Sequence, residues 1–174
     1  MKLTKLALTF SMLLCGSMLF AQQANFKKAW LEKWSNSRDY LIAVATAMPQ
    51  ESYDYKPTER EMSFEAQLVH IQSNMVWLGT EYFKMKSVSQ GQEAGNKLSK
   101  EELIASLKQS FDNVYQAVEN TPEKQFKEQV TFFAGDKSKF QILGLLQDHV
   151  THHRGQLIVY LNMKDIKPPS YVGW

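Results

Sequence analysis

Apolar residues recur at every third or fourth position along most of this chain, and that spacing constrains its fold more than any other feature. It is the period of an α-helix that buries one face. Four stretches show the pattern, at about residues 25–48, 63–85, 99–119 and 138–164. The sequence therefore predicts an all-α protein whose four helices, of about 20 residues each, pack along their apolar faces.

The ends of these stretches carry residues that start and stop helices. Ser63, Ser99 and Ser138 stand at the expected N-cap positions of the second, third and fourth stretches. Glu102 follows Ser99 by three residues, and Gln141 follows Ser138 by three, which is the pattern of a capping box. Prolines stand just beyond three of the stretches and favour an end there: Pro49, Pro122 and Pro168.

The segments between the helical stretches are long, with roughly 10 to 18 residues each. Four helices joined in this way predict a four-helix bundle. Loops of this length also permit crossover connections, so the order in which the helices neighbour one another stays open. Residues 126–135, in the last connection, can form either a short strand or an irregular loop.

Two kinds of residue inside the helical stretches predict how the helices pack. Trp30, Trp34 and Trp77 stand at helical spacing, and we expect large aromatic side chains of this kind to lie in the core. Gly155 interrupts the fourth stretch, where glycine costs about 1 kcal/mol relative to alanine. Close packing of a neighbouring helix against Gly155 would explain its presence.

The first 21 residues have the composition of a secretory signal peptide. Lys2 and Lys5 form a basic start, residues 6–20 carry no charge, and the small residue Ala21 follows. The apolar run of about 15 residues is shorter than the ~20 that a membrane-spanning helix needs. We therefore predict cleavage near Ala21 and a single domain, residues 22–174, located in the periplasm or secreted.

The only cysteine, Cys15, lies inside the predicted signal peptide. A lipoprotein signal at Cys15 is the less favoured alternative, because the preceding residue, Leu14, is larger than such signals prefer. Once the signal is removed the domain contains no cysteine. Thiolate metal ligands and cysteine nucleophiles are thereby excluded for the mature protein.

The predicted domain has no net charge. The chain contains 20 basic and 18 acidic residues, and removal of Lys2 and Lys5 leaves 18 of each. Nucleic-acid binding usually needs a concentrated basic face, so this balance argues against DNA or RNA as a partner. We also expect no stable membrane span after cleavage, while association into a homodimer stays open.

The four histidines fall on two of the predicted helices, and three of them are spaced to share a metal ion. His149 and His153 stand four residues apart, so their side chains are neighbours on one helix face. His70 lies within an apolar run of the second helix. If these helices face each other, three imidazoles can bind Zn, Ni, Fe or Co. His152 points about 100° away from His153, and we expect it to face outward.

The alternative interpretation of these residues is structural. A histidine pair can occur on a helix surface by chance, and a lone buried histidine is often a hydrogen-bonded core residue. The neighbouring amides are also ambiguous, because they can orient an imidazole or a metal-bound water, or simply lie at a helix seam: Gln67, Asn74 and Gln156. No carboxylate is spaced as a general base, since Asp148 is turned about 100° from His149 and Glu81 lies three turns beyond His70. That absence disfavours hydrolysis.

Several runs of sequence resemble the DinB-like superfamily, which is also called YfiT-like. The first half carries three of them: Tyr53-Asp54-Tyr55-Lys56-Pro57, Met62-Ser63-Phe64 and Leu68-Val69-His70-Ile71. The second half carries the most specific one, His149-Val150-Thr151-His152-His153-Arg154-Gly155-Gln156-Leu157, followed by Tyr160-Leu161 and Pro168-Pro169-Ser170-Tyr171.

The resemblance implies a four-helix bundle with a divalent metal bound by His70, His149 and His153. Members of this superfamily include metal-dependent thiol S-transferases, a maleylpyruvate isomerase and proteins assigned as hydrolases. The thiol transferases work in the cytosol with abundant low-molecular-weight thiols, from which the predicted export would separate this chain.

The sequence thus predicts an exported, metal-binding DinB-like bundle. Its expected function is that of a metal-dependent hydrolase or thiol S-transferase with a small-molecule substrate that the sequence does not name. A non-catalytic metal-binding or scaffold bundle in the periplasm is the alternative, and a purely structural bundle without metal is a third.

Overall fold

The computed structural model describes residues 26–86 and 98–174, so the predicted signal peptide and Cys15 lie outside the described residues. Most of the described chain is helical. The first helix covers residues 26–47, and the later long helices are α2 (Phe64–Phe83), α3 (Lys100–Asn120) and α4 (Lys139–Met163). Shorter elements lie in the connections: the 3-10 helices η1 (Gln50–Ser52) and η2 (Glu123–Lys127), and the strands β1 (Gln129–Val130) and β2 (Lys137–Ser138).

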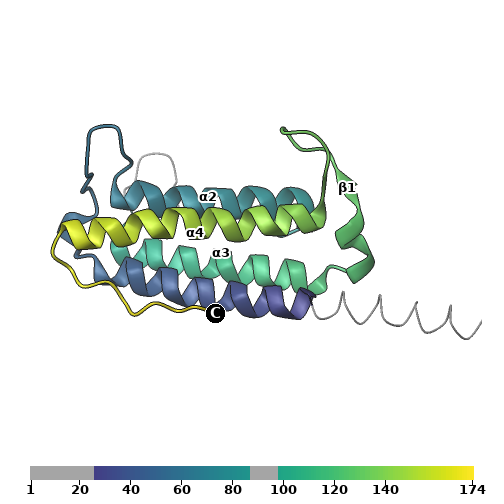
Figure 1. The fold of residues 1–174 in the computed structure, drawn as a ribbon, viewed down its shortest axis with the longest axis horizontal. Helices are drawn as coiled ribbons and strands as arrows, with labels where there is room; N and C mark the ends of the chain where they lie inside the picture. The colour runs from purple at the N-terminus through teal and green to yellow at the C-terminus, as the bar shows by residue number, and fades with distance from the viewer. Residues whose placement is uncertain (1–25, 87–97) are drawn as a thin grey trace, which may run out of the picture.

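The long helices form an all-α bundle, which confirms the predicted fold class. Figure 1 shows α2 and α4 side by side along one side of the bundle, with α3 and the first helix on the other. Helices α2 and α4 are antiparallel, because the Tyr160 hydroxyl near the end of α4 donates to the carbonyl oxygen of Met62, just before α2 begins. We call the contact line between α2 and α4 the seam.

The capping residues act as the sequence predicted. The Ser63 side chain accepts a hydrogen bond from the Ala66 amide at the start of α2. Capping boxes with both reciprocal hydrogen bonds begin α3, at Ser99, and α4, at Ser138. Helix α2 ends two residues before the predicted Met85, because Lys84 adopts a left-handed backbone conformation, with φ 55°, that closes the last turn.

The first helix is joined to its neighbours by two tryptophans that also fill the core. Trp30 and Trp34 are buried and stacked, with ring centroids 5.0 Å apart. The Trp34 indole N–H donates to the carbonyl oxygen of Phe111 on α3, at 3.0 Å, and that of Trp30 to Leu143 on α4, at 3.1 Å. Each ring therefore buries a large apolar surface while its one polar group stays satisfied.

The expectation for Trp77 was wrong, because its side chain is 42% exposed. The buried stripe of α2 follows Leu68, Ile71, Met75 and Leu78, and Trp77 is turned by one residue, or about 100°, from the last of these. Helical spacing placed Trp77 at the edge of the apolar face. The general tendency of tryptophan to be buried did not overcome that position.

The connection from α3 to α4 contains both structures that the sequence left open. The 3-10 helix η2 leads into a two-strand antiparallel hairpin in which Gln129 pairs with Ser138 and Val130 with Lys137. The hairpin rises above the α2–α4 side of the bundle at one end, and the segment before α2 rises above it at the other (Figure 1).

The C-terminal segment runs back from α4 toward the first helix (Figure 1). The Trp174 indole donates to the carboxylate of Glu32, and the Lys33 ammonium lies over the Trp174 ring. None of the helices in the described part of the chain combines the length and the apolar character needed to cross a membrane.

Two glycines show where helices pack closely and where they do not. A Cβ atom on Gly79 would lie 2.9 Å from the sulfur of Met85 and 3.3 Å from Val114 on α3, so α2 and α3 approach closely there. A Cβ atom on Gly155 would meet no atom within 4 Å. The expectation of close packing at Gly155 was therefore wrong, since this part of α4 faces open space.

Gly155→Ala should raise the free energy of unfolding by about 0.5–1 kcal/mol, because alanine favours the helix and meets open space. Gly79→Ala should lower it, because overpacking costs typically about 1–3 kcal/mol and outweighs the same gain in helix propensity. Urea unfolding of the metal-free protein measures both. Stabilisation by both substitutions would contradict the close approach at Gly79.

Candidate metal centre

Three histidines from two helices meet at the seam. His70 extends from α2, and His149 and His153 extend from successive turns of α4. Each offers one ring nitrogen, and these three atoms lie within 4.8 Å of one another. Nε2 of His149 and Nε2 of His70 are 3.1 Å apart. The antiparallel packing of α2 and α4 thus brings together side chains that are 79 residues apart in the sequence.

The spacing of these nitrogens fits a shared divalent ion. Two imidazole nitrogens bound to a tetrahedral zinc ion at 2.0–2.1 Å stand about 3.3–3.4 Å apart. The separation of 3.1 Å between His70 and His149 is close to that value. Within the described residues, the group that could hold an ion consists of histidines alone, a donor set suited to zinc, nickel or iron rather than calcium or magnesium.

Gln67 fixes the ring of His153. The ring contacts the side-chain oxygen of Gln67 through Nδ1, so Nδ1 carries the proton and Nε2 keeps a free lone pair. A hydrogen-bonded partner of this kind sets the tautomer and orientation of a metal-binding histidine. Gln67 is itself only 2% exposed, which keeps the interaction away from water.

A short polar network continues from Gln67. Its side-chain nitrogen donates to the oxygen of Gln156 and lies 3.4 Å from the hydroxyl of Tyr160. Gln156 in turn donates to Nε2 of His152 at 2.9 Å. His152 is exposed and lies outside the three-histidine group, as its angle on the helix indicated. The network therefore extends from a buried imidazole to the protein surface.

The role of the two glutamines stayed open in the sequence, between orienting an imidazole and lying at a helix seam or facing solvent. The structure places Gln67 and Gln156 in the network. Tyr160 was not expected to be part of the site. The available signal was its position four residues after Gln156 on the same helix face.

Two polar atoms near the histidines have no hydrogen-bond partner. They are Nδ1 of His149 and the side-chain oxygen of Asn74, one turn after His70 on α2, and both are shielded from solvent. A buried polar atom without a partner costs about 1–3 kcal/mol. A buried group of this kind in a native protein calls for an explanation, and a water or ion bound at the site is one.

The imidazoles of His149 and His153 are held in their uncharged form. Burial lowers the pKa of His149 to about 4, assisted by the nearby His153, His70 and His152. Burial also lowers the pKa of His153 to about 4, assisted by His70 and His152. Both rings are therefore neutral at pH 7, and a neutral imidazole is the form that binds a metal ion.

A family model described as the DinB family matches residues 22–170. The chain belongs to the DinB family. This confirms the resemblance that the histidine-containing runs indicated. No curated protein matches the chain.

Two solved DinB-like structures have a similar fold. A DinB-like protein from Bacillus subtilis is 20% identical, with a TM-score of 0.68 over 82% of this chain and 96% of that chain. One from Bacillus cereus is 15% identical, with a TM-score of 0.72 over 83% of this chain and 97% of that chain. At these identities the likeness shows the DinB-like fold and nothing more specific.

The lowered pKa values make stability depend on pH. An unfolded chain binds protons at its histidines below about pH 6.5, whereas His149 and His153 in the folded protein resist protonation until about pH 4. The free energy of unfolding of the metal-free protein should have its full contribution from His149 and His153 above pH 6.5. It should fall between pH 6.5 and 4 by on the order of a few kcal/mol.

Urea unfolding at a series of pH values measures this loss. Other groups also titrate in acid, so the informative quantity is the difference from H149Q, which lacks one of the two imidazoles. H149Q should lose less stability over the same range. An equal loss in the two proteins would contradict burial of a neutral His149.

Proposed function

We propose that this DinB family member binds one divalent metal ion through His70, His149 and His153, and uses it as a hydrolase or transferase on a small molecule. The observation that carries the proposal is the convergence of three ring nitrogens within 4.8 Å. The uncharged state of His149 and His153 and the support of His153 by Gln67 favour the same assignment.

Three protein ligands leave coordination positions for water or substrate. A bound ion lowers the pKa of a coordinated water or thiol, or polarises a substrate carbonyl. In this scheme the three histidines act as ligands and not as bases. Gln67 holds one of them in position, while Gln156 and His152 continue the network to solvent.

The residues of the proposed site favour group transfer over hydrolysis. Among the described residues no carboxylate belongs to the three-histidine group, and by helix geometry Asp148 is turned about 100° from His149 while Glu81 lies three turns beyond His70. A thiol that loses its proton on binding a metal needs less help from a base than an attacking water does. The predicted export would separate the protein from the cytosolic thiols, so a thiol cosubstrate would have to be available outside the cytosol.

The alternative is a non-catalytic metal-binding or scaffold bundle in the periplasm. An ion that joins α2 to α4 can serve folding alone. Screens of the metal-loaded protein against esters, amides and thiol conjugates distinguish the two. Turnover that depends on the metal favours the enzyme, whereas a large drop in melting temperature on chelation, without turnover in any screen, favours the scaffold.

Metal content tests the ligand assignment directly. The protein purified without a histidine tag should bind about one zinc or nickel ion per chain, measured by elemental analysis and calorimetry. His70→Ala, His149→Ala and His153→Ala should each abolish stoichiometric binding, because two imidazoles hold an ion weakly. His152→Ala is the matched control and should bind normally. Absence of metal from the wild type, or equal loss in the control, would refute the assignment.

Gln67 should act on the metal through His153. Gln67→Leu is expected to lower metal affinity by about 10–100-fold, because the imidazole loses the partner that orients it. Gln72→Leu is the matched control: Gln72 is also a buried glutamine of α2, but it bonds Ser106 and Ser110 on α3. Calorimetric titration with zinc compares the two. A similar loss in both variants would indicate damage to α2 rather than to the site.

A further inference from the structure

Three stacked aromatic rings, two of them exposed, lie on the same side of the bundle as the seam. Trp77 of α2 stacks with Phe132 and Phe133 of the hairpin, at centroid separations of 5.9 and 6.3 Å. Phe132 is buried, but Trp77 is 42% and Phe133 84% exposed. We call these three residues the aromatic shelf. Large rings exposed together on a protein surface commonly mark a binding site.

The hairpin holds Phe133 in an ordered turn. The Gly135 amide donates to the carbonyl oxygen of Phe132 at 3.0 Å, and Gly135 has a φ of 86°, which favours glycine. The Lys137 ammonium donates to the carbonyl oxygens of Ala134, Gly135 and Asp136 at 2.9–3.2 Å. A hydrogen-bonded turn therefore holds the Phe133 side chain in its exposed position.

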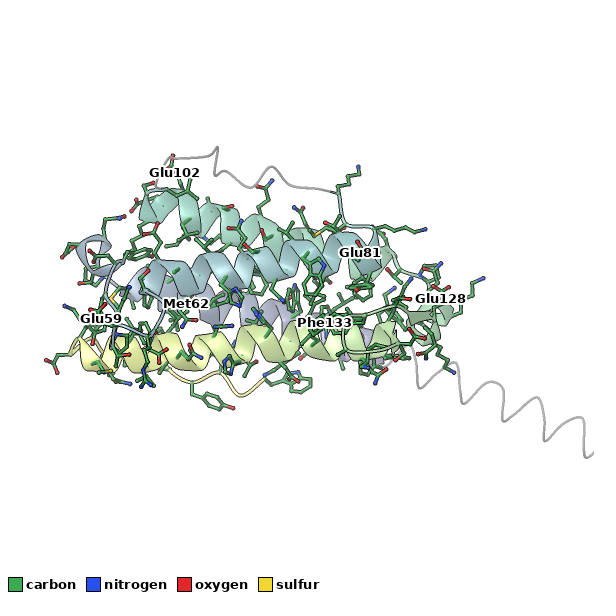
Figure 2. The ribbon with its side chains drawn as sticks, turned by 90° about the horizontal axis from the view of Figure 1, so that it is seen from above. Glu59, Met62, Glu81, Glu102, Glu128 and Phe133 are labelled. Atoms are coloured by element: carbon green, nitrogen blue, oxygen red, sulfur yellow. The ribbon has the colours of Figure 1, made fainter. Side chains whose placement is uncertain are left out.

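The shelf and the histidines belong to one continuous face. Trp77 follows His70 by seven residues, which places it within about 20° of the same direction on α2 and about 10 Å further along the helix. Asn74 lies between them on that face, and its side-chain oxygen is shielded from solvent and has no partner. Figure 2 shows Phe133 over the seam, with Met62 toward the opposite end.

We propose that the aromatic shelf binds the planar apolar part of the substrate, while the polar group of the same molecule reaches the metal centre. This inference rests on the proposed metal-dependent function. The substrate class is a small molecule in which an aromatic ring is joined, through a short linker, to an oxygen or sulfur group that binds metal.

The size of the shelf favours a small molecule over a second copy of the chain. The exposed parts of the three rings amount to roughly 300 Å². A stable protein interface covers about 800 Å² on each partner. One aromatic ring stacked on the shelf covers no more area than the shelf exposes. The histidines lie about 10 Å along α2 from Trp77, within reach of the same molecule.

Calorimetry of the zinc-loaded full chain with hydroxamic acids tests the shelf, because the hydroxamate group binds zinc and the substituent can be varied. The probes are acetohydroxamic acid, phenylalkyl hydroxamic acids with linkers of increasing length, and alkyl hydroxamic acids of equal carbon number. The best phenyl probe should bind about tenfold or more tightly than acetohydroxamic acid and more tightly than its alkyl counterpart. Phe133→Ala and Trp77→Ala should remove most of that gain without changing metal content or the affinity for acetohydroxamic acid.

Trp174→Ala is the matched control, since Trp174 is also exposed but contacts Glu32 and Lys33 of the first helix. It should keep the full gain. The shelf proposal would be overturned if acetohydroxamic acid binds and the phenyl probes bind no more tightly. It would also be overturned if the tighter binding of the phenyl probes survives both shelf substitutions. Either result would leave the proposed metal centre intact. A wild-type protein that binds no zinc would refute both proposals. Phe133→Ala that converts a dimer to a monomer, with the gain retained, would show that the shelf is a contact between copies.

Discussion

The seam between α2 and α4 depends on the side chain of Gln67. Its oxygen contacts His153 and its nitrogen contacts Gln156, so one buried amide is satisfied entirely by the opposite helix. Leaving such an amide unpaired costs about 1–3 kcal/mol. A slip of α2 along α4 by one residue, about 1.5 Å, would break these bonds. The same relative position of the helices brings His70 beside His149, so the position of the candidate metal centre follows from the pairing of Gln67.

Much of the site could be predicted because helical geometry relates sequence separation to direction. The spacing of four residues placed His149 and His153 together, and the turn of about 100° placed His152 outside. The meeting of α2 with α4 could not follow from spacing, because the long connections allowed several helix orders. For the same reason Gln67 and Gln156 stayed ambiguous until their partners across the seam were known.

The errors in the fold have a common physical origin. Trp77 was expected in the core because it is a tryptophan at helical spacing, and Gly155 was interpreted from residue type. The environment of each is set by its exact position on the helix surface. Trp77 lies one residue away from the buried stripe of α2, and Gly155 faces open space on α4. The hairpin was uncertain because strands of two residues carry no measurable period. Sequence patterns were thus informative for long periodic segments and weak where a few residues or a tertiary contact decided the structure.

The origin of the three imidazoles on two separate helices has a consequence for the mechanical behaviour of the bundle. The ion proposed to bind His70 and His149 would act as a cross-link that closes a loop of 79 residues. Cross-links over long loops remove much freedom from the unfolded chain. Loss of that ion would lower the free energy of unfolding, so the metal-free protein would be cut more readily by proteases.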